Sequence, residues 1–166
     1  PDFWLWQCRK LMCVYEQVVR LEFDYLYIIN TSSYVLIENL VDYCKRAKNV
    51  GLYAGPVVKS GNLDFVSGSS RLISRDVFEM VVKNREHFDL WRVEDVQFGK
   101  VLFSLGVKPT DLSSTEISSF EQIATMTDLE LKKNFHIRVK SGTQKKRSDV
   151  SIMYGIHERL SNNTVN

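Results

Sequence analysis

The fold is decided by residues 65–76, Phe-Val-Ser-Gly-Ser-Ser-Arg-Leu-Ile-Ser-Arg-Asp, which join an apolar run to a turn of small residues. The apolar run predicts a strand over residues 63–66, and the Ser-Gly-Ser-Ser sequence predicts the turn that ends it. Ser74 is a typical first residue of a helix, so the chain is expected to restart as a helix over residues 74–83. Because glycine has no side chain, such a turn lets a bulky polar ligand approach the backbone closely.

A second short stretch places two adjacent acids at the start of another expected helix. It is residues 92–100, Arg-Val-Glu-Asp-Val-Gln-Phe-Gly-Lys, and the helix is expected over residues 94–105, ended by Gly106. Glu94 and Asp95 have two interpretations. They complement the helix dipole, or a carboxylate beside the small-residue turn removes a proton from a hydroxyl. The second interpretation suits sugar transfer from a nucleotide sugar to an alcohol.

Length and composition indicate one globular domain over residues 1–166, with 44% hydrophobic and 25% charged residues. The net charge of +2 is too small to indicate binding to nucleic acid or to a membrane surface. There is no apolar run of about 18 residues and no secretory signal, which favours a cytoplasmic location. The chain opens on Pro1 and an aromatic cluster at residues 3–6, so we expect a fragment whose upstream part is missing.

The three cysteines do not predict a metal site. Cys8, Cys13 and Cys44 are odd in number, and their spacing fits no zinc pattern. Cys8 and Cys13 fall in a helical pattern, where free cysteine behaves as a small buried hydrophobe. We therefore expect no metal at these positions and no disulfide framework.

The remaining pattern alternates helices with short strands, which predicts an α/β fold with a partly parallel sheet. Apolar residues at helical spacing and β-branched or aromatic runs define these elements. Helices are expected over residues 3–20, 34–47 and 149–160, strands over 23–29, 50–54 and 135–140, and a loop with short pieces of structure over 107–128.

The order of motifs resembles the GT-A glycosyltransferases, nearest to the fringe and β-galactosyltransferase type. The motifs are the strand at 23–29 with its polar turn, Gly-Leu-Tyr-Ala-Gly-Pro, Val-Ser-Gly-Ser, Leu-Ile-Ser-Arg-Asp and Glu-Asp-Val-x-x-Gly. The resemblance covers residues 23–107 and, more weakly, 135–160. It implies a Rossmann-like, mixed and mostly parallel sheet flanked by helices, of which this chain would hold the C-terminal half.

The resemblance also implies an activity. It is the inverting transfer of a hexosyl unit from a nucleotide-sugar donor to a hydroxyl of a glycan or glycoconjugate acceptor. Asp95 would act as general base, and Glu94 would orient it or bind an acceptor hydroxyl. Ser67, Gly68 and Ser69 would touch the acceptor, although a plain turn explains these three residues equally well.

One departure from the family bears on the metal. The strand ending at Ile29 is followed in the family by an Asp-x-Asp motif that holds a divalent cation on the nucleotide diphosphate. This chain has Asn30, Thr31, Ser32 and Ser33 instead. Neutral amide and hydroxyl oxygens bind a hard cation far more weakly than carboxylates do. We therefore expect donor binding by Asn30, Thr31 and Ser32 without a metal or other cofactor.

Without a metal, positive side chains must stabilise the departing diphosphate. Arg138 and Lys140 are two residues apart on the strand expected over 135–140, so they point to the same face, and Lys145, Lys146 and Arg147 follow in a loop. Alternatively, Arg138 and Lys140 line the solvated face of an edge strand. His136 is interpreted as a core histidine.

Two hypotheses for the whole chain remain open. The chain is a metal-independent glycosyltransferase, or it is a non-catalytic carbohydrate-binding or structural relic of the same fold. The paired acids Glu94 and Asp95 and the basic strand favour the enzyme. The missing metal carboxylates and the missing upstream segment favour the relic.

Overall fold

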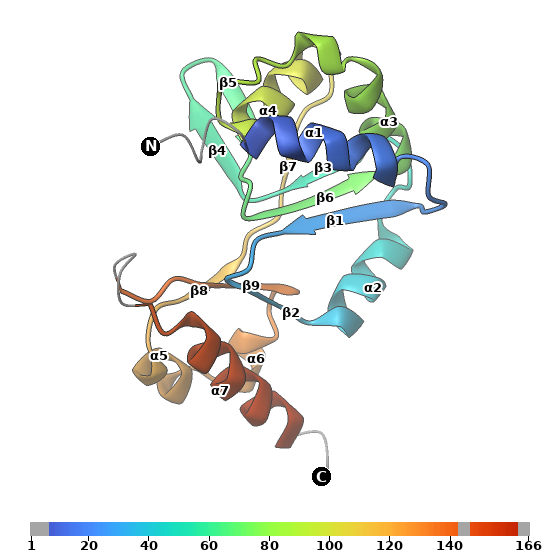
Figure 1. The fold of residues 1–166 in the computed structure, drawn as a ribbon. Coiled ribbons are helices and arrows are strands. Elements are labelled where there is room, and N and C mark those ends of the chain that lie inside the picture. Colours follow the sequence, from blue (N-terminus) through green and yellow to red (C-terminus); the bar gives the residue numbers. More distant parts are fainter. Residues whose placement is uncertain (1–6, 143–146, 163–166) are drawn as a thin grey trace. The chain divides into compact units, whose positions relative to one another are not determined.

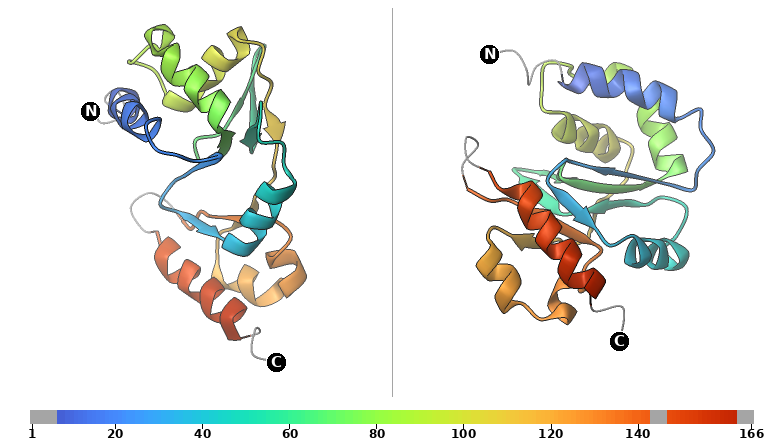
Figure 2. Two further views of the ribbon diagram at one scale, coloured as in Figure 1. Left: turned by 90° about the vertical axis from the view of Figure 1, so that its right-hand side faces the viewer. Right: turned by 60° about the horizontal axis from the view of Figure 1, so that its bottom comes forward.

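The computed structural model describes residues 7–142 and 147–162, which form two compact units (Figures 1 and 2). The first unit takes in residues 1–29 and 46–112, and the second takes in residues 30–45 and 113–166. Helices and strands occur in both units, so the α/β class is confirmed. The expectation that residues 1–166 behave as a single domain stays a prediction.

The first unit is built around a four-stranded sheet in the order β1-β6-β3-β7. β6 lies between β1 and β3 and pairs antiparallel with both, whereas β7 runs parallel to β3. The elements of this unit are α1 (Gln7–Val18), β1 (Tyr25–Ile29), β3 (Tyr53–Gly55), β4 (Val57–Ser60), β5 (Leu63–Val66), β6 (Ser70–Ser74), α3 (Arg75–Lys83), a 3₁₀ turn (Arg85–His87), α4 (Glu94–Ser104) and β7 (Thr110–Asp111).

Three helices, α1, α3 and α4, lie together on one side of β1 and β6 (Figures 1 and 2). Their apolar faces and the sheet enclose one core, in which Phe78 and Phe98 are fully buried. Tyr15 of α1 meets both rings edge-to-face, at centroid distances of 5.3 and 6.1 Å. Such edge-to-face pairs are a preferred aromatic geometry, and they hold α1 against α3 and α4.

Two glycines explain how α4 is placed and ended. A methyl group at Gly99 would come within 2.3 Å of Phe65 Cβ, so only glycine lets α4 lie this close to β5. Gly106 has a φ of +77°, the left-handed conformation that commonly ends a helix. The helix predicted over residues 94–105 is therefore confirmed, with α4 observed at Glu94–Ser104.

The second unit has a three-stranded sheet in the order β2-β9-β8. β9 is the middle strand, antiparallel to β2 and parallel to β8, and Ile137 and Val139 are fully buried beneath α7 and α5. The elements of this unit are β2 (Ser33–Val35), α2 (Ile37–Arg46), β8 (Thr115–Ile117), α5 (Phe120–Thr125), α6 (Asp128–Leu131), β9 (His136–Val139) and α7 (Asp149–Asn162).

Several predictions about these elements are wrong. The helix predicted over residues 74–83 is itself confirmed as α3 with Ser74 at its N-cap, but the chain does not restart as a helix directly after the small-residue turn, because β6 intervenes. The sheets are mixed but not mostly parallel, since β1–β6, β3–β6, β2–β9 and β4–β5 are all antiparallel. The edge-strand interpretation of β9 also fails, because β9 has a neighbour on each side.

Cys8 is a buried member of the core, as predicted, whereas Cys13 is exposed. Burial, with the nearby charges of Glu94 and Asp89, raises the pKa of the Cys8 thiol to about 11, so this thiol is a poor nucleophile at neutral pH. Among the helices of the described residues, none has the length and apolar character to cross a bilayer.

Candidate functional site

The small-residue turn is held by bonds within itself and to a neighbouring segment. Ser67 donates its backbone N–H to the carbonyl oxygen of Pro56 at 2.9 Å, and Ser70 donates to the carbonyl of Ser67 at 3.4 Å. The Ser67 hydroxyl accepts from the backbone N–H of Ser69 at 3.3 Å and lies 3.1 Å from the Ser69 hydroxyl. Ser67, Gly68 and Ser69 are half-buried, so part of the turn is open to solvent.

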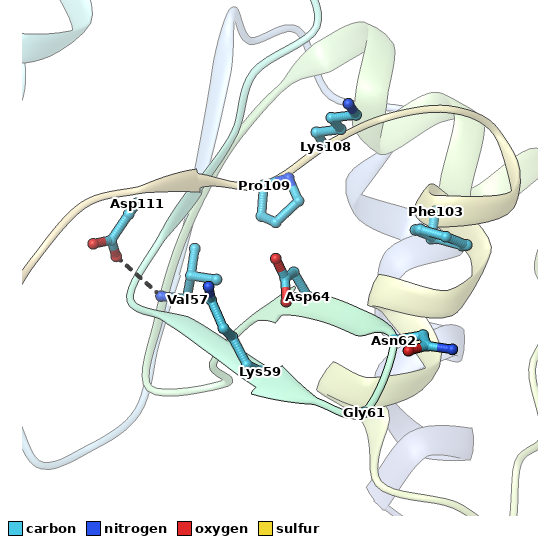
Figure 3. A pocket seen from close by; sticks show the side chains of 9 residues that line it. All are labelled: Val57, Lys59, Gly61, Asn62, Asp64, Phe103, Lys108, Pro109 and Asp111. Atoms are coloured by element: carbon cyan, nitrogen blue, oxygen red, sulfur yellow. Dashed lines mark hydrogen bonds between the residues drawn. The ribbon is translucent and has the colours of Figure 1, made fainter.

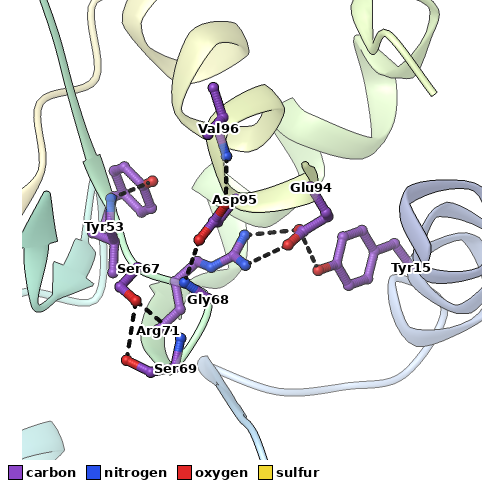
Figure 4. Close-up of polar contacts among 10 residues, drawn as sticks. Tyr15, Tyr53, Ser67, Gly68, Ser69, Arg71, Glu94, Asp95 and Val96 are labelled. Atoms are coloured by element: carbon purple, nitrogen blue, oxygen red, sulfur yellow. Dashed lines mark hydrogen bonds and ion pairs between the residues drawn. The ribbon is translucent and has the colours of Figure 1, made fainter. Parts of the chain in front are cut away.

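Asp95 is fastened directly to this turn (Figure 4). Its Oδ2 accepts a hydrogen bond from the backbone N–H of Gly68 at 2.8 Å, and its Oδ1 accepts from the backbone N–H of Val96 at 2.9 Å. A methyl group at Gly68 would lie 3.2 Å from Asp95 Oδ2, a tight contact. The half-buried carboxylate therefore has a fixed position beside the turn, at the start of α4.

Glu94 points to the other side, into the core (Figure 4). Arg71 of β6 donates to both of its oxygens, Nη1 to Oε1 at 2.9 Å and Nη2 to Oε2 at 2.7 Å. Tyr15 Oη donates to Oε1 at 2.7 Å. The side chain of Glu94 is only 6% exposed and that of Arg71 only 1%. This carboxylate is thus engaged inside the protein.

The electrostatics of the buried group follow from these contacts. Burial alone would raise the pKa of Glu94, but the charge of Arg71 and the hydrogen bonds from Arg71 and Tyr15 outweigh it, and the pKa lies below its ordinary value. Burial also raises the pKa of the Tyr15 hydroxyl well above its ordinary value, so Tyr15 stays protonated and donates its hydrogen bond to Glu94. The Arg71 guanidinium lies 4.2 Å from the centroid of the Phe98 ring, a cation–π contact.

In the second unit, the polar turn after β1 is closed by the side chain of Asn30. Its Oδ1 accepts from the backbone N–H of Ser32 at 3.2 Å and from the Ser33 hydroxyl at 2.9 Å. A hydroxyl has one proton, so the contact between Ser33 Oγ and His136 Nε2 at 2.9 Å makes His136 the donor there. Asn30 Oδ1 is therefore used within the turn.

His136 is the core histidine that the sequence predicted, with 2% of its surface exposed. Its Nδ1 is buried and has no hydrogen-bond partner among the residues that the structure describes. Burial, followed by the charge of Arg138, lowers the pKa of His136 to about 4. The imidazole is therefore neutral at pH 7.

Arg138 lies beside the same turn, because it is the register partner of Ser33 in the β2–β9 pair. Arg138 is half-buried, and its Nη1 is buried without a partner within residues 7–142 and 147–162. Burial and then the charge of Arg147 lower the pKa of Arg138, whereas the carboxylates of Asp149 and Glu116 act in the opposite direction. Arg147 itself forms an ion pair with Asp149. Lys140 follows the end of β9 and is exposed.

The structure brings the predicted residues together in two groups. Asp95 contacts the turn of Ser67, Gly68 and Ser69 in the first unit, and in the second unit Arg138 pairs with Ser33, the residue that follows Asn30, Thr31 and Ser32. Lys145 and Lys146 of the predicted phosphate loop lie outside the described residues. Sequence reasoning gave no role to Arg71. An arginine between small and branched apolar residues, Ser-Ser-Arg-Leu-Ile, was the available signal for a buried ion pair.

Neither group contains a cluster of metal ligands. Among the described residues, no three His, Cys, Asp or Glu side chains are placed to hold one ion. Comparison of the chain with known protein families and with curated protein sequences finds no match.

Proposed function

We propose that the chain belongs to an inverting glycosyltransferase that moves a hexosyl unit from a nucleotide sugar to a glycan hydroxyl, with Asp95 as general base. The observation that carries this proposal is the hydrogen bond of 2.8 Å from the Gly68 backbone to Asp95 Oδ2. It fixes a half-buried carboxylate beside a turn with two hydroxyl groups, those of Ser67 and Ser69.

The geometry leaves Asp95 able to accept a proton. Each carboxylate oxygen has two lone pairs, and each oxygen of Asp95 accepts one backbone hydrogen bond. One lone pair on each oxygen therefore remains for an acceptor hydroxyl. As that hydroxyl oxygen attacks the anomeric carbon, its proton passes to Asp95. The bond from the anomeric carbon to the diphosphate breaks, and the electron pair leaves with the nucleoside diphosphate.

Glu94 has a positioning role in this proposal. Of the two roles expected for it, contact with an acceptor hydroxyl is disfavoured by its burial and its three hydrogen bonds from Arg71 and Tyr15. Orientation of Asp95 is favoured, because Glu94 is the first residue of α4 and anchors that helix end to β6. The helix end in turn carries Asp95.

The second unit, taken by itself, holds a candidate residue for binding the diphosphate of a donor. Arg138 has a buried Nη1 without a partner in the described ranges and is influenced by the charge of Arg147. Arg147 is already paired with Asp149, so what an anion at this place would gain is a hydrogen bond from the buried Nη1 of Arg138. A diphosphate suits a guanidinium, which can bind phosphate through two parallel hydrogen bonds. Lys140 adds an exposed charge near the end of the same strand.

The test is a transfer and hydrolysis assay on the purified full-length protein with a panel of nucleotide sugars and glycan acceptors. Asp95→Asn keeps the shape of the side chain and removes its basicity, so turnover should fall by about 10²–10⁴-fold with donor binding nearly unchanged. Asp42→Asn, a surface carboxylate in α2 whose partner is Lys45, is the matched control and should not change turnover.

Two outcomes contradict the proposal. If Asp95→Asn retains turnover within about threefold of the parent, Asp95 acts only as a residue that caps α4 and the turn. If the folded parent protein binds glycans but no nucleotide sugar, the non-catalytic relic is the correct description. The buried ion pair between Glu94 and Arg71 is the observation that favours this second candidate, because it leaves Glu94 unable to contact a substrate.

A further inference from the structure

A hollow in the first unit shares no residue with the small-residue turn or with the acids Glu94 and Asp95. It has a volume of about 620 Å³, within the range of small-molecule sites. Three segments line it: the β4–β5 hairpin, the last turn of α4 and the chain that leads into β7 (Figure 3). The residues that matter are Lys59, Asn62, Asp64, Phe103, Pro109 and Asp111.

The polar groups of this hollow are available for a ligand. Lys59 and Asp64 are direct register partners across the hairpin, yet within the described part of the chain neither forms an ion pair or a side-chain hydrogen bond. Asn62 lies in the exposed hairpin turn between them. Asp111 Oδ1 accepts from the backbone N–H of Val57 at 3.1 Å, which leaves its other oxygen open among the contacts described.

The apolar part of the hollow is also open. Phe103 is 61% exposed, although it is a large aromatic side chain near the end of a well-packed helix. Pro109 lines the same space. A pocket with an aromatic face and a few oriented polar groups recognises a ligand that has both an apolar face and polar edges. A sugar ring presents its C–H groups on one face and its hydroxyls around the edge.

The charges of the lining balance, because Lys59 and Lys108 are matched by Asp64 and Asp111. A phosphate or sulfate on the ligand would lie beside the carboxylates of Asp64 and Asp111 as well as the two lysines, so its charge would add little to the binding free energy. Hydroxyl groups can donate to the carboxylates and accept from the ammonium and amide groups. The lining therefore favours a neutral saccharide over an anionic one.

We propose that this hollow binds a neutral saccharide and serves as a subsite for sugars of the glycan acceptor that do not react. Its service to an acceptor rests on the proposed transferase function, whereas saccharide binding itself does not. Phe103 and Asp95 lie on the same helix, separated by about 12 Å along its axis at 1.5 Å per residue. Binding energy from such remote sugars can hold the reacting sugar in place.

The experiment is a titration of the full-length, ¹⁵N-labelled protein with neutral trisaccharides of β-linked glucose, galactose and N-acetylglucosamine, followed by NMR. A sulfated trisaccharide is titrated in parallel. We expect at least one neutral trisaccharide to shift amide signals of residues 57–64 and 103–111. Phe103→Ala should weaken that binding by about tenfold, equivalent to 1.4 kcal/mol. Phe120→Ala removes an exposed phenylalanine of the second unit and is the matched control.

Each outcome decides the question. Asp64→Asn keeps the shape of the pocket and should also weaken binding, so the result does not depend on one variant. The proposal is overturned if no neutral trisaccharide shifts these signals up to about 10 mM, a tenfold margin over millimolar affinity. It is also overturned if only the sulfated sugar binds, or if Phe103→Ala binds like the parent. If the hollow binds a saccharide but the protein transfers no sugar, this inference stands and the transferase proposal fails. If the protein transfers sugar but the hollow binds no saccharide, the transferase proposal stands and this inference fails.

Discussion

Arg71 and Glu94 form a buried, two-pronged ion pair, with N–O distances of 2.9 and 2.7 Å, that ties the central strand β6 to the first residue of α4. Tyr15 of α1 donates a third hydrogen bond to the same carboxylate. Three elements of the first unit therefore meet at one polar point inside an apolar core. Asp95, the next residue of α4, accepts a hydrogen bond from the Gly68 backbone, so the two adjacent acids connect the start of α4 to the core and to the turn.

Removing the charge of Glu94 should strongly destabilise the first unit. Glu94→Gln leaves Arg71 buried without a counter-charge, and breaking a buried pair in this way costs about 3–5 kcal/mol. Urea unfolding followed by tryptophan fluorescence measures the change, because Trp91 lies in this unit. Glu22→Gln removes a 96%-exposed partner of Arg75 and should leave the midpoint unchanged. Equal midpoints for both variants would contradict this assignment.

Acid should destabilise the second unit through His136. The pKa of His136 is about 4 in the folded protein and 6.5 in an unstructured peptide, so the unfolded chain binds the proton more readily. The contribution of neutral His136 to the free energy of unfolding is therefore fully present above pH 6.5. This contribution is up to about 3 kcal/mol, at 1.36 kcal/mol per pKa unit, and it is lost as the pH falls towards 4.

His136→Gln should remove this loss between pH 6.5 and 4, as measured by urea unfolding at several pH values. The exposed His87 provides the control, since His87→Gln should leave the pH dependence as it is. The lowered pKa of Glu94 acts in a separate, more acidic window. Its contribution is present above the ordinary carboxylate pKa and is lost below it. A parent protein whose stability is flat from pH 7 to 4 would rule out the buried neutral imidazole.

The sequence predicted the elements that carry their own local signals. α4 has acids at its first turn and Gly106 after its end, and α7 has Asp149 at its start, so both helices lie close to the expected residues. The hydrogen bond between Asp95 and the Ser-Gly-Ser turn agrees with the expectation of a carboxylate beside this turn. These signals act over a few residues and do not need the rest of the fold.

The elements that were missed depend on distant partners. β2 has only three residues, and its pairing with β9 joins Ser33 to Arg138, far along the chain. β6 was missed because its five residues are buried on both faces and show no alternation. The mostly parallel sheet was expected from the alternation of helices and strands, but β1 and β3 both pair antiparallel with β6. The division into two units follows from such contacts and has no local signal.

Nucleotide-diphosphate binding should not depend on a divalent metal. The turn after β1 offers neutral oxygens, and Asn30 Oδ1 already accepts hydrogen bonds from Ser32 and Ser33. Calorimetric titration in EDTA and in manganese should give the same affinity. Asn30→Asp adds one carboxylate and should increase any effect of manganese. A gain beyond about tenfold with manganese in the parent, equivalent to 1.4 kcal/mol, would show that a metal site exists.

Arg138 should bind the diphosphate of the donor. It is half-buried beside the Asn30–Ser33 turn, its Nη1 lacks a partner among the described residues, and the charge of Arg147 acts on it. Arg138→Ala should therefore weaken binding of nucleoside diphosphates by about 1.5–3 kcal/mol, the range for a hydrogen bond to a charged group. The corresponding nucleosides lack the phosphates and should lose little affinity.

Calorimetry with the four common nucleoside diphosphates and their nucleosides measures both effects. Lys133→Ala removes an exposed positive charge outside the predicted site and is the matched control for a general loss of charge. A fall in affinity with Lys133→Ala as large as that with Arg138→Ala would mean that only the net charge of the protein matters. Equal losses for the diphosphates and the nucleosides would instead show that Arg138 supports the fold of β9 between β2 and β8 and does not contact the phosphates.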